Sequence, residues 1–351
     1  MSSRKVRVIS PDKHDLTGLN VLITGGNRGI GWEMARLYLT LGADTIYLAV
    51  RDLKKGKEAR YALLADQVVR HRNPMADVIL YEVDLSNLDS VVSFCNKFCS
   101  EVKVLHIAVL NAAIDLPYYR FTSDGMEESF QVNFFSNAIL ANYLVPLLML
   151  NRPERRKFTG RQGRKLAKGS HFETMPSHLT WVVSTMNRNS GITQDGLIDP
   201  RDSIFAWFRN KNNMSSNRFE ETKFLATAYI LELGRFVDRN YLIVNTASPG
   251  HVRSGRHNNF PFLLRRLWSV FDFLFARRTA EGATAIIWAT LSGSNKNATY
   301  WSNGMPSRPA RLLHETEGKI FRTHLWDETK IQIRRLDKEI PVIRSLSGGA
   351  G

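Results

Sequence analysis

The sequence predicts an α/β fold with a doubly wound parallel sheet, in a single domain that spans residues 1–351. In the first 115 residues short apolar runs alternate with longer helix-like segments, and a glycine-rich turn follows the first run. Strands that alternate with helices of this length are typical of βαβ units. Strands buried on both faces of a parallel sheet read as near-continuous apolar runs, as these do. The expected architecture is therefore Rossmann-like.

The first half of the chain supplies the opening strands and helices. The run NVLIT at 20–24 is a strand that ends in a glycine-rich turn, and the helical segment 32–43 ends at Gly42. The other elements expected here are strands at 45–50, 77–85 and 104–111, and helices at roughly 54–71 and at 88–102.

The pattern resumes in the second half. An apolar-periodic helix is expected at 125–150, and a helix with acidic residues in its first turns at 215–238. The remaining expected elements are strands at 179–185, 241–250 and 298–303, and a helix at 281–292.

Two segments interrupt this rhythm. Residues 151–178 hold eight Lys or Arg against two Glu without periodicity, which indicates a solvated basic insertion or a contact to a membrane or partner. Residues 260–278 are dense in aromatic side chains between arginines and could pack in the core, close a pocket or lie on a membrane interface. We expect a helical, apolar lid over 256–278, and hence a bulky hydrophobic substrate.

Composition narrows the cellular setting. The net charge of +15 favours anionic partners, such as a phosphorylated cofactor or a membrane surface, but no nucleic-acid motif appears. Cys95 and Cys99 lie four residues apart and fit core packing in a reducing compartment. No secretory signal and no bilayer-spanning apolar run is evident. We expect a cytoplasmic protein, with peripheral membrane contact through 151–178 or 260–278 as an alternative.

The glycine-rich turn is the strongest local motif. Thr24, Gly25, Gly29 and Gly31 form TGxxxGxG between a strand and a helix. Glycines in this position let the backbone approach a pyrophosphate at the positive end of the helix. The context predicts a dinucleotide site.

The residue after the second strand indicates which dinucleotide binds. An NAD site commonly has an acidic residue there, whereas this chain has Arg51, with Arg28 inside the glycine turn. Guanidinium groups suit a 2′-phosphate, so NADP(H) is the expected cofactor. Two alternatives remain: Asp52 could take the acidic role, or Arg51 could be a plain surface residue.

From about residue 18 to 255 the ordered motifs resemble the short-chain dehydrogenase/reductase family, and the chain as a whole looks similar to fungal members of secondary-metabolite clusters. The motifs that carry the resemblance are TGGNRGIG (24–31), VDL (83–85), LNAAI (110–114), QVNFF (131–135), WVVST (181–185) and PGHVRS (249–254). The resemblance and the two arginines together give the residues expected to contact the cofactor: Thr24, Gly25, Asn27, Arg28, Gly29, Ile30, Gly31, Arg51, Asp84, Leu85, Asn111, Ala112, Lys223, Pro249, Gly250, Val252 and Ser254.

The resemblance also implies a catalytic group. In this family a Tyr donates a proton to the substrate oxygen, a Lys holds the nicotinamide ribose, a Ser binds the substrate oxygen and an Asn positions a water. Lys223 matches the Lys, and Asn133 matches the Asn or has a structural role. The Ser position falls on Thr185, with Ser184 as the register alternative, and the Tyr position falls on Phe219, which has no proton to give.

Loss of a general acid typically costs about 100- to 10,000-fold in rate. Three interpretations follow: a reductase with a substitute donor, a non-redox cyclase or isomerase in the old pocket, or a cofactor-binding scaffold. His251 could be a replacement acid, and Tyr118 or Tyr119 could point into the pocket. The nine histidines lack metal-ligand spacing, so no metal is expected. Members of this family often associate as dimers or tetramers through their long helices, so the resemblance implies a possible homo-oligomer.

Overall fold

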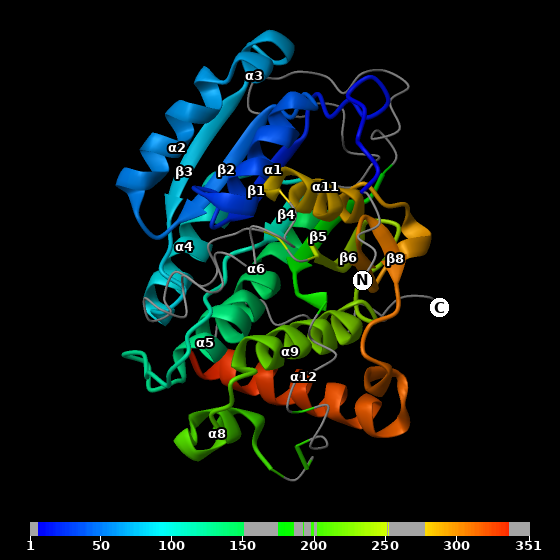
Figure 1. Cartoon of the computed structure of the whole chain (residues 1–351). Helices are drawn as coiled ribbons and strands as arrows, with labels where there is room; N and C mark the ends of the chain where they lie inside the picture. Colours follow the sequence, from blue (N-terminus) through cyan, green and yellow to red (C-terminus); the bar gives the residue numbers. More distant parts are fainter. Residues whose placement is uncertain are drawn as a thin grey trace.

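A computed structural model describes residues 6–150, 175–185, 192, 198–199, 202–250, 252 and 278–336. Its centre is a sheet with the strand order β3-β2-β1-β4-β5-β6-β7-β8 (Figure 1). The strands are β1 (Asn20–Thr24), β2 (Thr45–Val50), β3 (Asp77–Glu82), β4 (Ile107–Leu110), β5 (Ser177–Val182), β6 (Leu242–Ser248), β7 (Thr299–Ser302) and β8 (Met305–Ser307). All neighbours pair in parallel except β7 and β8. The predicted α/β class with a doubly wound parallel sheet is confirmed.

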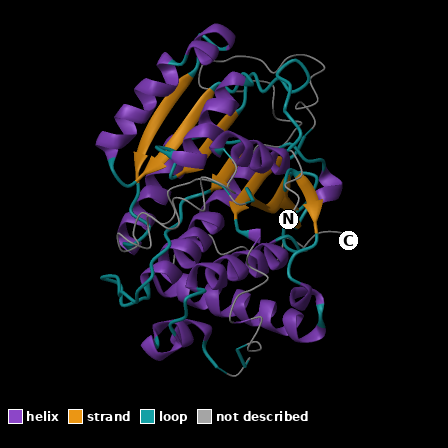
Figure 2. Cartoon of the chain, in the orientation of Figure 1, coloured by secondary structure: helices purple, strands orange, loops and turns teal. Residues whose placement is uncertain are grey.

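Helices cover both faces of the sheet (Figure 2). The α-helices are α1 (Gly29–Thr40), α2 (Leu53–Ala65), α3 (Gln67–Arg72), α4 (Leu88–Glu101), α5 (Glu128–Phe130), α6 (Ser136–Leu150), α8 (Ile204–Arg209), α9 (Arg218–Leu233), α11 (Thr279–Thr290) and α12 (Thr316–Leu336). Shorter turns are η1 (Gln131–Phe135), η5 (Lys211–Asn213), η7 (Ser294–Lys296) and η8 (Arg311–His314). One apolar cluster joins α1, α3 and α11 to the sheet, and a second joins α4, α6, α9 and α12 to the other face.

The strand order places a binding crevice. It reverses between β1 and β4, which pair in parallel from Val21 with Ile107 to Ile23 with Val109. In open α/β sheets, ligands bind beyond the carboxyl ends of the strands at this switch point. Thr24 ends β1 and Asn111 follows β4, so the sequence motifs at 24–31 and 110–114 meet there.

Several predicted boundaries were wrong. The single helix expected over 54–71 is two helices, because the carboxylate of Asp66 accepts hydrogen bonds from the backbone of Val68 and Val69 and starts α3. The basic insertion does not extend to 178, since Ser177 and His178 already pair in β5. Residues 151–174 and 253–277, which hold most of the insertion and the expected lid, lie outside the described residues.

The long helix expected from 125 begins at Glu128 and runs to Leu150 through α5, η1 and α6. Its length, and the mean hydropathy of 1.4 in its most apolar 18-residue window, would suffice to cross a membrane, contrary to the expectation that no such segment exists. Of its most apolar window 89% is buried inside the protein, so this helix serves as part of the core.

The two cysteines pack as expected. Both are free thiols on α4, with Cys95 buried and Cys99 partly buried. Burial raises the pKa of Cys99 to about 11, which keeps its thiol protonated near neutral pH.

The C-terminal helix α12 has no counterpart in the sequence prediction. It lies along α9 (Figure 1), where the Trp326 ring packs on Tyr229 at 4.9 Å and stacks on Phe236 at 5.0 Å. Arg322 Nε reaches the buried Glu232 carboxylate at 2.9 Å. Glu328, also on α12, accepts a 2.8 Å hydrogen bond from the backbone N–H of Ile204 through its carboxylate, so α12 also caps α8.

Trp326→Ala is expected to lower the free energy of unfolding by about 3–5 kcal/mol, since it empties a buried aromatic contact. Trp326 is 2% exposed. Denaturant unfolding followed by circular dichroism measures the change. Ile331→Ala on the same helix, where Ile331 is 49% exposed, is the matched control and should shift stability by less than about 0.5 kcal/mol. Equal effects of the two variants would contradict this packing.

Candidate active site

The turn after β1 is shaped for a close backbone approach. Gly25 and Gly29 adopt positive φ angles of 66° and 57°, which side chains rarely allow. A Cβ on Gly31 would lie 2.4 Å from the carbonyl oxygen of Gly25 and 2.8 Å from Nδ2 of Asn111. The turn at the α1 N-terminus therefore has no room for an added side chain at position 31, and its backbone conformation is of the kind that lets a pyrophosphate approach. Asn27 in this turn and Ile30 in the first turn of α1, both also expected here, are half-buried.

Thr24 fastens the ends of β1 and β4. Its Oγ1 accepts hydrogen bonds from the backbone N–H groups of Asn111 at 2.9 Å and Ala112 at 3.0 Å. Asn111 Nδ2 donates to the Thr24 carbonyl oxygen at 2.9 Å. These side chains thus build the floor of the crevice through bonds to the protein itself.

The basic residues flank the crevice. Arg28 directly precedes α1 and Arg51 follows β2, and both are exposed. Asp52 caps α2 by accepting a hydrogen bond from the backbone N–H of Lys55 at 3.1 Å, and it pairs with the Lys55 ammonium at 3.3 Å. The hydrogen bond from Lys55 holds the pKa of Asp52 below its usual value. Asp52 is thus committed to the helix cap, which weighs against its alternative role.

The turn after β3 holds the two remaining residues of the VDL motif. Asp84 Oδ1 accepts hydrogen bonds from the backbone N–H of Ser86 at 2.9 Å and from its hydroxyl at 2.6 Å. Leu85 is buried, and its carbonyl accepts a bond from Ser136 on α6. Asp84 therefore shapes the loop that follows β3.

The turn after β6 carries the PG motif. Gly250 has a positive φ of 78°, and Pro249 and the buried Val252 pack against Gly282 of α11. Ser254 and His251 lie outside the described residues.

Helix α9 presents the central pair of the site. The buried Lys223 donates one hydrogen bond from Nζ to the carbonyl oxygen of Val182 at 2.9 Å, where β5 ends. The same Nζ lies 5.4 Å from the centre of the Phe219 ring. Ser184 and Thr185 lie two and three residues after the end of β5 and are half-buried. The structure thus brings Lys223 and Phe219 together at the carboxyl end of β5.

Asn133 is held by the protein on both sides of its amide. Oδ1 accepts from the backbone N–H of Ile114 at 2.8 Å, and Nδ2 donates to the Ile114 carbonyl at 2.8 Å. Nδ2 also donates to Thr222 Oγ1 at 3.1 Å. Asn133 lies in the π-turn η1. Of the two expected roles, the geometry displays the structural one.

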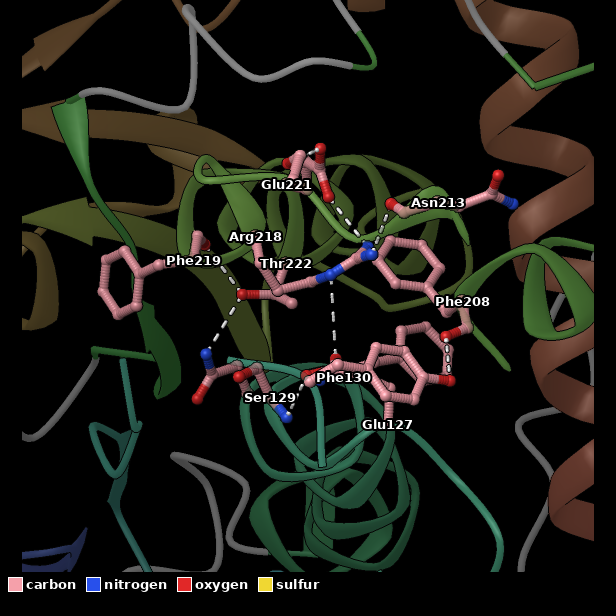
Figure 3. A network of polar contacts seen from close by, with 12 residues as sticks. Glu127, Ser129, Phe130, Phe208, Asn213, Arg218, Phe219, Glu221 and Thr222 are labelled. Atoms are coloured by element: carbon pink, nitrogen blue, oxygen red, sulfur yellow. Dashed lines mark hydrogen bonds and ion pairs between the residues drawn. The ribbon is translucent and has the colours of Figure 1, made fainter. Parts of the chain in front are cut away.

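Thr222 was missed by sequence reasoning. Its hydroxyl donates to the Phe219 carbonyl at 2.7 Å while it accepts from Asn133, so it joins α9 to η1 (Figure 3). A threonine directly before the expected Lys was the available signal. Tyr119 donates to the carbonyl of Arg209 at 2.5 Å and so packs on α8, while Tyr118 is exposed.

Metal chemistry has no visible support in the described part of the chain. No group of three or more His, Cys, Asp or Glu residues there could hold a metal ion.

Comparisons with known proteins agree with this geometry. The sequence profile of the family described as short chain dehydrogenase matches residues 19–160. A short chain dehydrogenase of Arthrobotrys oligospora is 39% identical over 331 residues, which cover 94% of this chain and 97% of that protein. The chain belongs to the short-chain dehydrogenase/reductase family.

A second fungal relative and a solved structure extend this comparison. The short-chain dehydrogenase/reductase phmF of Phaeosphaeria nodorum is 26% identical, with 97% of this chain and 93% of that protein covered. The solved Pseudomonas aeruginosa RhlG/NADP active-site complex aligns at 19% identity with a TM-score of 0.55, covering 84% of this chain and 97% of that chain. The expected similarity to fungal members is therefore confirmed, and the fold is that of nicotinamide-binding oxidoreductases.

Gly31→Ala tests the cradle of this dehydrogenase. The added Cβ must displace backbone, so we expect weaker binding of NADPH and NADH and a loss of about 1–3 kcal/mol in the free energy of unfolding. Nucleotide fluorescence titration and denaturant unfolding measure the two effects. Gly293→Ala is the control, because the nearest atom to its added Cβ lies 3.7 Å away. Unchanged nucleotide affinity in Gly31→Ala would show that the turn does not hold the cofactor.

Proposed function

We propose that this oxidoreductase is an NADP(H)-dependent reductase of bulky hydrophobic substrates in fungal secondary metabolism, with Phe219 in place of the usual general acid. The observation that carries this proposal is the retained Lys223. Its buried ammonium is anchored on the Val182 carbonyl and faces the Phe219 ring at 5.4 Å. A buried Lys is costly to maintain, which favours a working role.

The preference for NADP(H) rests on the two exposed arginines beside the crevice. Arg28 precedes helix α1, whose N-terminus would receive the pyrophosphate, and Arg51 directly follows strand β2. A guanidinium can bind a phosphate through two parallel hydrogen bonds. Among the solved relatives, an Escherichia coli short chain dehydrogenase is described as complexed with NADPH and a Brucella melitensis reductase with NADH.

Bound NADPH would supply a hydride to an electrophilic carbon. The residues of this chain then have to stabilise the negative charge that develops on the substrate oxygen. The Thr185 hydroxyl is the donor available at the Ser position, and the Lys223 cation adds a favourable field. Phe219 keeps a ring in place of a phenol but donates no proton. This set fits substrates that need little protonation, such as iminium ions or enones.

The substrate class and location extend the same proposal. The aromatic residues of 256–278 favour an apolar pocket, and hence a polyketide-, terpenoid- or steroid-like substrate. The low number of cysteines favours a location in the reducing cytoplasm. Because the net charge is basic, the proposal includes peripheral contact with an anionic membrane.

A second function is favoured by one observation. At position 219 the chain has an apolar ring with no proton to donate. A pocket without a general acid can steer a cyclisation or isomerisation of a reactive intermediate with no net redox change. A cofactor-binding scaffold is the third interpretation.

Arg51→Ala tests the cofactor preference. Loss of a charge-assisted contact is worth about 1.5–3 kcal/mol, so we expect NADPH to bind about 10- to 100-fold more weakly while NADH affinity stays unchanged. Fluorescence titration with both nucleotides measures the ratio. Arg60→Ala is the control, since Arg60 pairs at 4.0 Å with Asp77 and lies on α2 away from the crevice. An equal loss for both nucleotides would contradict recognition of the 2′-phosphate.

Phe219→Tyr tests the proposed reductase. The added phenol beside Lys223 restores a proton donor, and we expect NADPH-dependent reduction of the ketone 1-tetralone to rise about 100-fold or more. Phe219→Leu, which lacks both ring and hydroxyl, should show no gain. Absorbance at the NADPH band follows the reaction. If NADPH binds but Phe219→Tyr gains nothing, the non-redox function becomes the better conclusion.

A further inference from the structure

A buried arginine lies directly before Phe219 and has no part in the proposed chemistry. Arg218 is 1% exposed and is surrounded by partners from three different segments (Figure 3). The sequence gives no hint of this, since an arginine at a helix start is normally solvated.

The guanidinium of Arg218 uses its donors in different directions. Nη1 donates to Glu221 Oε2 at 2.8 Å, and Nη2 donates to the carbonyl oxygen of Asn213 at 2.7 Å. Nε lies 3.9 Å from Glu127 Oε2, an ion pair without a hydrogen bond. The guanidinium carbon lies over the Phe208 ring, 4.5 Å from its centroid, and over the Trp207 ring, 5.2 Å from its centroid.

The two carboxylates are themselves fixed. Glu127 accepts backbone hydrogen bonds from Ser129 at 3.0 Å and Phe130 at 2.7 Å, and so caps the helix that continues to Asn133. Glu221 accepts from the hydroxyl of Ser215 at 2.6 Å. Burial raises the pKa of Glu127, and the nearby Arg218 opposes this shift. The arginine is therefore the cation that keeps two buried acids compatible with the fold.

Each partner belongs to an element beside the site. Glu127 starts the segment that carries Asn133, Glu221 lies on α9 between Phe219 and Lys223, and Asn213 ends η5. Phe208 belongs to α8 and stacks on Phe130 at 4.5 Å. The Asn133–Thr222 hydrogen bond already links α9 to η1, and the Arg218–Glu127 ion pair forms a second link, between α9 and the start of α5.

We propose that Arg218 is a positioning residue that sets the spacing of the Asn133 and Phe219 segments and holds α8 and η5 against them. The proposal rests on the proposed function for the pocket itself. Only a planar guanidinium can donate to Glu221 and Asn213 while it stacks on an aromatic ring. Lysine keeps the charge but has neither the fork nor the flat face.

The experiment compares two variants in the Phe219→Tyr background. Arg218→Lys keeps a cation between the acids, and the double variant Arg218→Met/Glu221→Gln removes the arginine without leaving both carboxylates uncompensated. Arg235→Met is the control, because Arg235 makes a similar i−3 ion pair with Glu232 but is 62% exposed. Steady-state reduction of 1-tetralone gives kcat and KM, and fluorescence titration gives the NADPH affinity.

In both test variants we expect kcat to fall about 10- to 100-fold, as small misplacements of catalytic groups do, with NADPH affinity unchanged. Amide hydrogen exchange, measured well below each variant's own unfolding transition, should rise about 10-fold or more in 204–213 and 128–135. The control should match its parent in both measurements. Variants that lose thermal stability but keep kcat would show a merely structural role and overturn the proposal.

The exchange measurement separates the two proposals. If Phe219→Tyr shows no reductase activity, the proposed function fails. The role of Arg218 is then decided by amide hydrogen exchange in Arg218 variants that keep the native Phe219. Faster exchange confined to 204–213 and 128–135 supports the positioning role. Exchange equal to that of Arg235→Met overturns it.

Discussion

The rest of the structure depends on the hydrogen bonds of the Thr24 hydroxyl. It accepts the backbone N–H groups of Asn111 and Ala112 and so joins the ends of β1 and β4 where the strand order reverses. At this junction the glycine turn, the loop after β4 and the α1 N-terminus come together. The side chain of Asn111 completes the junction from the opposite strand. A parallel sheet opens a crevice there in any case, but these bonds fix its dimensions.

Beyond the junction, helix α9 combines two tasks that usually compete. Nearly all of its residues are buried, including Arg218, Glu220, Glu221 and Lys223, so it belongs to the core and carries the candidate site. Buried charges of this kind stay only when they are paired and hydrogen-bonded. Arg218, Glu221 and Lys223 meet this condition through hydrogen bonds to Asn213, Ser215 and Val182. The positions of the site residues are thus set by electrostatic necessity as well as by packing.

Sequence reasoning recovered seven of the eight described strands because most of them contain apolar runs, and it missed the short antiparallel strand β8. It located the crevice because glycines mark the close approach of backbone. It missed α12, whose apolar positions such as Phe321, Leu325 and Ile333 are separated by many charged residues. It joined α2 and α3, since a single capping aspartate decides that break. It could not foresee the burial of Arg218, because no local pattern shows that Glu127, 91 positions earlier in the chain, will lie beside it.

The cap that Glu328 supplies to α8 links sites far apart in the sequence. Its carboxylate bonds the Ile204 backbone across 124 residues, and His324 contacts the Asp202 carbonyl across 122. During synthesis the residues that form the β1–β4 crevice therefore leave the ribosome long before α8 can be anchored by α12. Contacts of such separation form late and slowly in folding. A nascent chain would thus form the β1–β4 crevice first and anchor α8 only after α12 has been synthesised.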